Sequence, residues 1–175
     1  MRIAALVLSS VAVLFAIGFG FQLRKAIAAG IETDAYLPYM IQALVLLLFA
    51  LLLRMFAALC ELLWLERTWS NLPEELRVVG PVQKVTSGLV IGLSFVPGVA
   101  WFWKLGLVMG IADGFEKMRA RYPFQAPVPR KLGMVAVIVG WVPGLNVYVA
   151  PFLWEVFATR IETVMGELLA ATERA

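Results

Sequence analysis

Long apolar runs alternate with short polar connections along the chain, and this pattern predicts membrane-spanning helices. The first run covers residues 3–21 and contains no charged side chain. The second covers residues 36–65 and is interrupted only by Arg54 and Glu61. As a helix rising 1.5 Å per residue, the second run would be roughly 45 Å long, which exceeds the ~30 Å hydrocarbon core of a bilayer. We therefore expect residues 1–65 to form two transmembrane helices.

A cleaved signal peptide is the alternative interpretation of the first run. The apolar core of a signal peptide is normally about 7–15 residues long. Here the run is longer, and Arg24 and Lys25 lie where a cleavage region should be neutral. We expect the first helix to be retained as a transmembrane helix.

The second half of the chain contains one motif twice. Residues 95–98 read Phe-Val-Pro-Gly and residues 141–144 read Trp-Val-Pro-Gly, 46 positions apart. Near the C-terminus, apolar side chains recur on one helical face, at Phe157, Ile161, Val164 and Leu168. Residues 1–175 are expected to form one membrane domain. After the first two helices, the predicted segments are a polar loop with a short surface helix (66–84), repeat 1 (85–121), a Pro-rich extended loop (122–131), repeat 2 (132–160) and an amphipathic C-terminal helix (161–175).

Each repeat allows two architectures. The arm at residues 132–142 would be about 16 Å long as a helix, which is only half a membrane. Proline lacks an amide donor and glycine permits a sharp turn. Each repeat is therefore either one kinked span or a re-entrant helical hairpin, whose tips would contain Pro97, Gly98, Pro143, Gly144 and Asn146.

The distribution of lysine and arginine favours the hairpins. Cytoplasmic loops of membrane proteins carry an excess of positive charge. Hairpins place eleven of these residues on the side of both termini and two on the other, whereas spans divide them seven against six. The tryptophans beside the tips, Trp101, Trp103 and Trp141, argue the other way, because tryptophan prefers the membrane interface. We predict an all-α integral membrane protein with two full transmembrane helices and two re-entrant hairpins. The alternative is four transmembrane helices, the last two kinked.

Composition agrees with a membrane protein. Hydrophobic residues make up 62% of the chain and charged residues 15%, whereas soluble domains have about 45–50% and about 25%. The loop at 113–131 alone accounts for the net charge of +3, because it contains five basic residues and two acidic residues, Asp113 and Glu116. We expect these basic residues to contact anionic lipid headgroups, not nucleic acid. They are Lys117, Arg119, Arg121, Arg130 and Lys131.

The residues that most enzymes and metal sites use are scarce. The chain has no histidine and one cysteine, Cys60. This argues against histidine-based catalysis, haem and metal clusters. The chain also lacks a glycine-rich loop ending in Gly-Lys-Ser/Thr, so no nucleotide site is indicated. We therefore predict a protein that is not an enzyme and has no cofactor or metal.

Four charged residues interrupt the apolar segments: Arg54, Glu61, Lys104 and Glu155. A charge inside a bilayer costs about 2.5–3.5 kcal/mol, so each is a functional candidate. The alternative role is structural. Lys104 can extend towards solvent, and Arg54 can pair with Glu155 to hold helices together.

Glycines spaced by four residues predict close helix packing. One stripe contains Gly106, Gly110 and Gly114, and a second contains Gly88 and Gly92. Small residues allow helix backbones to approach each other inside a membrane. We expect these faces to contact another helix, within the chain or in another subunit.

Repeat 2 resembles a family of small bacterial membrane proteins. The run at 142–146, Val-Pro-Gly-Leu-Asn, is similar to their Ile/Val-Pro-x-Val-Asn segments, and residues 111–117 resemble the charged helix end that follows. Repeat 1 departs from the pattern because Ala100 stands where the asparagine would fall. The resemblance covers about 70 residues and implies a bacterial inner-membrane protein, with no activity to transfer.

The sequence leaves two functional hypotheses. The first is a non-enzymatic membrane subunit or scaffold that packs into a homo- or hetero-oligomeric complex and shapes the bilayer. The second is an oligomeric channel or transporter subunit with an intramembrane charged path.

Overall fold

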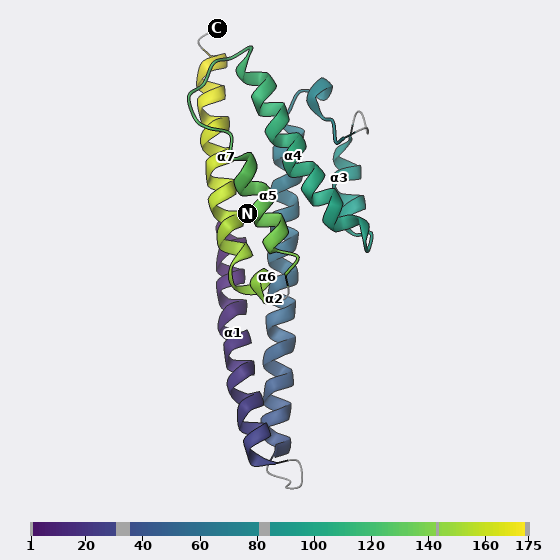
Figure 1. The fold of residues 1–175 in the computed structure, drawn as a ribbon, viewed down its shortest axis with the longest axis vertical. Helices are drawn as coiled ribbons and strands as arrows, with labels where there is room; N and C mark the ends of the chain where they lie inside the picture. The colour runs from purple at the N-terminus through teal and green to yellow at the C-terminus, as the bar shows by residue number, and fades with distance from the viewer. Residues whose placement is uncertain (1, 31–35, 81–84, 143, 174–175) are drawn as a thin grey trace. The chain divides into compact units, whose positions relative to one another are not determined.

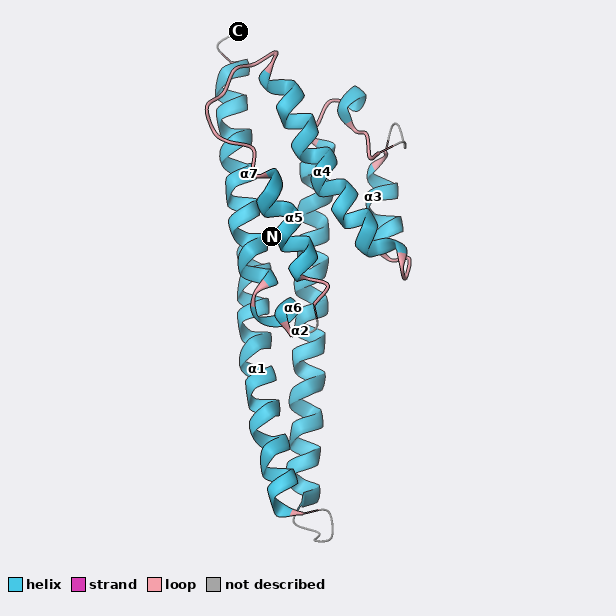
Figure 2. Cartoon of the chain, in the orientation of Figure 1, coloured by secondary structure: helices cyan, strands magenta, loops and turns pink. Residues whose placement is uncertain are grey.

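The computed structural model describes residues 2–30, 36–80, 85–142 and 144–173, and over these ranges the chain is helical without strands (Figure 2). Helices α1 and α2 are long and apolar enough to span a membrane. The all-helical prediction is thereby confirmed for the described residues. In chain order the elements are α1 (Arg2–Ala29), α2 (Tyr36–Ser70), the 3-10 helix η1 (Glu74–Leu76), α3 (Ser87–Ser94), α4 (Val99–Arg119), α5 (Arg130–Val139), α6 (Leu145–Tyr148) and α7 (Ala150–Thr172) (Figure 1).

The chain divides into two compact units, which we call the N-terminal unit (residues 3–60) and the C-terminal unit (residues 61–175). In the N-terminal unit, α1 and the first part of α2 form an antiparallel pair. Phe15 stacks on Phe49 with ring centroids 5.6 Å apart, and Arg54 Nη1 donates a hydrogen bond of 3.4 Å to Ser9 Oγ.

Small side chains form the buried seam of this pair, and the large aliphatic side chains point outward. This arrangement is typical of helices that pack inside lipid, where close backbone approach replaces a hydrophobic core. The buried residues are Ala5, Ser9, Ala12, Ala26, Ala43, Ala50 and Ala57.

The exposure pattern of α2 changes at Glu61. From there on the buried residues recur with helical spacing, at Glu61, Trp64, Leu65, Thr68 and Trp69. Trp69 is fully buried and its Nε1 donates a hydrogen bond of 2.9 Å to the Val85 carbonyl. The predicted polar loop at 66–84 therefore starts too early, because burial of this face extends α2 to Ser70. The short helix expected within that loop is η1, and residues 81–84 lie outside the described part of the chain.

The C-terminal unit contains two helical hairpins that share a core with the end of α2. Helix α3 packs on α4, α5 packs on both α4 and α7, and α6 packs on α7. Trp103 of α4 donates its Nε1 proton to the Val90 carbonyl of α3 at 3.2 Å. The chain thus folds back at each Pro-Gly motif.

The predicted boundary between repeat 2 and a separate C-terminal helix is wrong. Helix α7 runs without interruption from Ala150 to Thr172. The apolar face proposed for the terminal segment begins earlier, at Trp154, and is buried along its whole length. A single buried face keeps the two segments in one helix.

Both hairpin turns have the same backbone conformation. Gly98 has φ 79° and Gly144 has φ 84°, values that favour glycine because a Cβ atom would clash with the backbone. The amide of Ala100 donates to the Val96 carbonyl at 3.0 Å, and that of Asn146 donates to the Val142 carbonyl at 3.0 Å. Pro143 lies outside the described residues.

Alanine at Gly98 or Gly144 should lower the free energy of unfolding by about 1–2 kcal/mol, the cost of a left-handed conformation. Neither position has atoms within 4 Å of an added Cβ, so the effect would come from the backbone alone. Gly92→Ala is the control, because it lies within α3 with the same open space and should gain up to ~1 kcal/mol. Denaturant unfolding in mild detergent would measure all three, and equal effects would contradict the turn geometry.

Candidate functional site

A cluster of charged and aromatic side chains joins α2, α4 and α7 in the C-terminal unit. We call it the charged–aromatic cluster, and it consists of Glu61, Trp64, Lys104, Trp154 and Glu162. Lys104 Nζ lies 3.0 Å from Glu61 Oε2, and the Glu61 side chain is only 4% exposed. The same ammonium lies 4.1 Å from the centroid of the Trp154 ring. Lys104 therefore interacts with a carboxylate and an aromatic face together.

The tryptophans extend the cluster across the helices. Trp64 Nε1 donates a hydrogen bond of 3.1 Å to Glu162 Oε1. Its ring meets the Trp154 ring edge-on at 5.9 Å and the Phe157 ring at 6.1 Å. These are favourable geometries for aromatic pairs, so α2 and α7 are fixed to each other by polar and apolar contacts.

The cluster is better suited to holding helices than to chemistry. Glu61 already binds a cation, so it is not placed as a free general base. Among the described residues no group of three or more His, Cys, Asp or Glu side chains could hold a metal ion. The half-buried ion pair and the aromatic contacts instead connect α2, α4 and α7.

The four charged residues singled out in the sequence fall in different places. The structure brings Glu61 and Lys104 together, so Lys104 forms an ion pair where the sequence suggested that it extends to solvent. Arg54 contacts Ser9 in the N-terminal unit, and Glu155 is a half-buried residue of α7 in the C-terminal unit. The Arg54–Glu155 pair stays a prediction.

The stripe on α4 is a packing surface within the chain. A Cβ added at Gly106 would lie 2.6 Å from Val79 Cγ1, and one at Gly110 would lie 2.7 Å from the Val78 carbonyl oxygen. At Gly114 it would lie 3.1 Å from the Leu72 side chain. The partner is thus the end of α2 and the segment that follows it.

The stripe on α3 behaves differently. Gly88 and Gly92 are exposed, and a Cβ there would meet only the Thr86 hydroxyl at 3.9 Å or nothing. Sequence reasoning missed Gly133, where a Cβ would lie 2.5 Å from Val108 Cγ1 and 2.6 Å from Phe157 Cε2. Gly133 lies alone, outside any stripe, so its packing role has no local signal.

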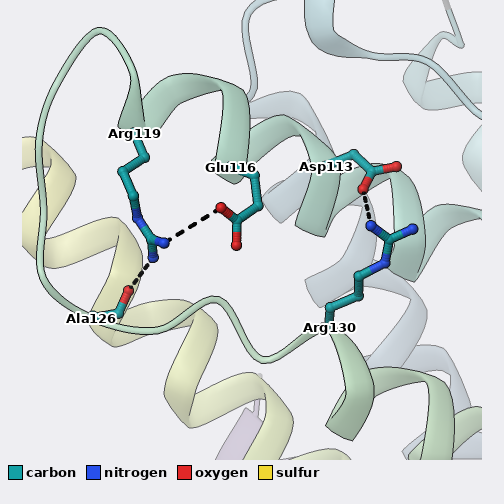
Figure 3. Close-up of polar contacts among 5 residues, drawn as sticks. All are labelled: Asp113, Glu116, Arg119, Ala126 and Arg130. Carbon is teal, nitrogen blue, oxygen red and sulfur yellow. Dashed lines mark hydrogen bonds and ion pairs between the residues drawn. The ribbon is translucent and has the colours of Figure 1, made fainter.

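Three of the five basic residues assigned to lipid headgroups have partners within the chain. Arg130 Nη1 lies 2.7 Å from Asp113 Oδ1, and Arg119 donates to the Ala126 carbonyl at 2.7 Å (Figure 3). Arg121 Nη1 lies 3.3 Å from Glu75 Oε1. A backbone hydrogen bond and then Arg121 hold the pKa of Glu75 below its usual value. Lys117 and Lys131 are exposed and form no ion pair with any described residue.

The hairpin turns meet in a largely exposed apolar surface, which we call the tip surface: residues 95–102, 138–142, 144–146, 148 and 149. Trp101 stacks on Trp141 with centroids 6.1 Å apart, and Phe102 meets Trp141 edge-on at 5.8 Å. Trp101 is 59% exposed and Phe102 71% exposed. Trp103, in contrast, is buried, and its indole N–H donates to the Val90 carbonyl. Its hydrogen-bonding group is therefore satisfied within the protein and does not require a position at the membrane interface.

Comparisons with protein-family models, with curated proteins and with solved structures found no match. The resemblance of repeat 2 to small bacterial membrane proteins therefore stays a prediction. Function has to be argued from the geometry of the chain itself.

Proposed function

We propose that the chain is a non-enzymatic integral membrane scaffold. In this proposal α1 and the first part of α2 span the membrane, and the C-terminal unit inserts its two hairpins into one leaflet. Lipid is then the solvent for the tip surface, and the basic residues at the other end of the hairpins face the headgroups. The equal backbone geometry of the two turns also supports an internal repeat.

The observation that carries this proposal is that exposed hydrophobic side chains and charged side chains lie in different parts of the C-terminal unit. Large exposed hydrophobic residues occur near the turns, within 89–102 and 135–156, with Leu63 and Leu169 as the exceptions among residues of described exposure. The same segments contain only one charged residue, Glu155. An exposed apolar surface of this extent indicates a membrane or protein interface.

The length of the apolar arms fits one leaflet. From Leu132 to Val139, α5 rises about 12 Å, and half the hydrocarbon core is about 15 Å. Irregular backbone at membrane depth needs protein around it, and the Trp101–Trp141 stack places one turn against the other. These lengths support insertion to the middle of the bilayer without crossing it.

A scaffold role follows from what surrounds this surface. Hairpins that enter from one side add area to that leaflet, which would shape the bilayer. The remaining exposed faces, including Gly88 and Gly92 on α3, suit packing in a homo- or hetero-oligomer. The excess of lysine and arginine on the side of the termini supports a cytoplasmic position for both, in a bacterial inner membrane. The Glu61–Lys104 ion pair favours this role over a conducting path.

Accessibility labelling tests the topology. In a Cys60→Ala background, single cysteines would replace the exposed residues Glu74 and Gln125, with Arg24→Cys as a reference for the other side. We expect an impermeant thiol reagent added to sealed inside-out vesicles to label positions 74 and 125 together and position 24 only after detergent. Labelling of 74 and 125 from opposite sides would mean that residues 85–121 cross the membrane, and the proposal would be wrong.

A further inference from the structure

The two helices of the second hairpin lie in a register that can be read from their contacts. A Cβ added at Gly140 would lie 3.8 Å from the Ala150 Cβ atom, and one at Gly133 would lie 2.6 Å from the Phe157 ring. A step of seven residues from Gly140 to Gly133 therefore matches a step of seven residues from Ala150 to Phe157, as expected for two antiparallel helices. Two positions further from the turn, Lys131 comes level with Thr159 and Arg160.

Each of these basic residues ends an exposed apolar stripe. On α5 the exposed positions are Arg130, Lys131, Val135 and Ile138, whereas Gly133, Ala136 and Val137 are buried. On α7 the exposed positions Phe152, Val156 and Arg160 are spaced by four, so they share one face. Neither Lys131 nor Arg160 forms an ion pair with another described residue.

The distance of these cations from the turn, measured along the helices, is close to the thickness of the hydrocarbon region of one leaflet. Lys131 lies eight residues from the end of α5 and Arg160 ten residues from the start of α7, which corresponds to about 12 Å and about 15 Å along the helices. Half the hydrocarbon core is about 15 Å thick, so both cations would reach the phosphate level. Lys117 is different, because it lies 18 residues from the start of α4, or about 27 Å.

We propose that Lys131 and Arg160 form a binding site for the phosphate of an anionic phospholipid. The acyl chains would lie along Val135 and Ile138 on α5 and along Phe152 and Val156 on α7. This inference rests on the proposed insertion of the hairpins and names the lipid class that they contact. It also replaces most of the residues first assigned to headgroups, since Arg119, Arg121 and Arg130 are bound within the chain.

The test is lipid retention by the full chain, measured by native mass spectrometry in mild detergent with added phosphatidylglycerol or phosphatidylcholine. The double variant Lys131→Gln/Arg160→Gln is compared with Lys117→Gln/Arg121→Gln, which removes the same charges from more distant exposed positions. We expect the first variant to bind phosphatidylglycerol about 30-fold more weakly than the unmodified chain, at about 1 kcal/mol per residue and 1.4 kcal/mol per factor of ten. The control variant should bind nearly as well as the unmodified chain.

Three outcomes would overturn the inference. Equal loss in both variants would show a diffuse electrostatic effect, and no loss in either would show that the site is elsewhere. Unchanged binding of phosphatidylcholine is expected, because it lacks the net negative charge. Displacement of bound lipid by millimolar inorganic phosphate would identify a site for free phosphate instead. The thiol-labelling pattern of the double variant separates failure of this site from failure of the proposed topology.

Discussion

Replacing Gly133 by alanine is expected to lower the free energy of unfolding by about 2 kcal/mol. The added Cβ would lie 2.5 Å from Val108 Cγ1 and 2.6 Å from Phe157 Cε2, closer than van der Waals contact allows. Both neighbours are fully buried, so neither can move without displacing the core. Overpacking of this kind costs up to ~3 kcal/mol, and the better helix propensity of alanine returns about 1 kcal/mol.

Gly166→Ala is the matched control for this substitution. Gly166 also lies within a helix of the C-terminal unit, and nothing stands within 4 Å of an added Cβ. Alanine there should stabilise the protein by about 1 kcal/mol. Denaturant unfolding in mild detergent, followed by tryptophan fluorescence, measures both. Similar behaviour of the two variants would contradict the packing of α5 between α4 and α7.

The features predicted well from sequence are those that repeat along the chain. Long apolar runs predicted α1 and α2, and the buried face of α7 was visible as a helical period. Gly98 and Gly144 of the two repeated motifs adopt a positive φ, which glycine tolerates, whereas the re-entrant insertion of the tips stays a prediction. The spacing of Gly106, Gly110 and Gly114 predicted a contact with another helix, whereas most of the atoms that they meet belong to the segment after α2.

Pairing between distant residues could not be predicted in the same way. Glu61 and Lys104 are 43 residues apart, and their meeting depends on how α4 packs against the end of α2. The sequence predicts too short an α2 for a related reason. Polar residues after Leu65 indicate a loop, but Trp69 and Leu72 among them are buried by tertiary contacts. The sequence predicts that the basic loop faces lipid, because it does not show that Arg119 and Arg130 bind within the chain.

Replacing Lys104 by methionine is expected to destabilise the protein by about 2–3 kcal/mol. Methionine keeps most of the side-chain volume and removes the charge, which leaves the Glu61 carboxylate buried without its cation. Breaking a buried pair costs about 3–5 kcal/mol, and we expect less because a third of the Lys104 side chain is exposed. Glu61→Gln combined with Lys104→Met should recover most of the loss, because neither charge of the pair then remains.

The double-mutant cycle on Glu61 and Lys104 decides between a structural and a conducting role for these charges. A structural pair gives a coupling energy well above zero in unfolding measurements, and ion flux through reconstituted liposomes is the same in every variant. Arg121→Met is the control, since Arg121 and Glu75 form a pair of the same type with both side chains more than half exposed, and solvent should leave almost no effect. A coupling energy near zero would contradict the cluster geometry. Loss of flux at unchanged stability would favour the channel, because a residue on a conducting path affects transport without holding the helices together.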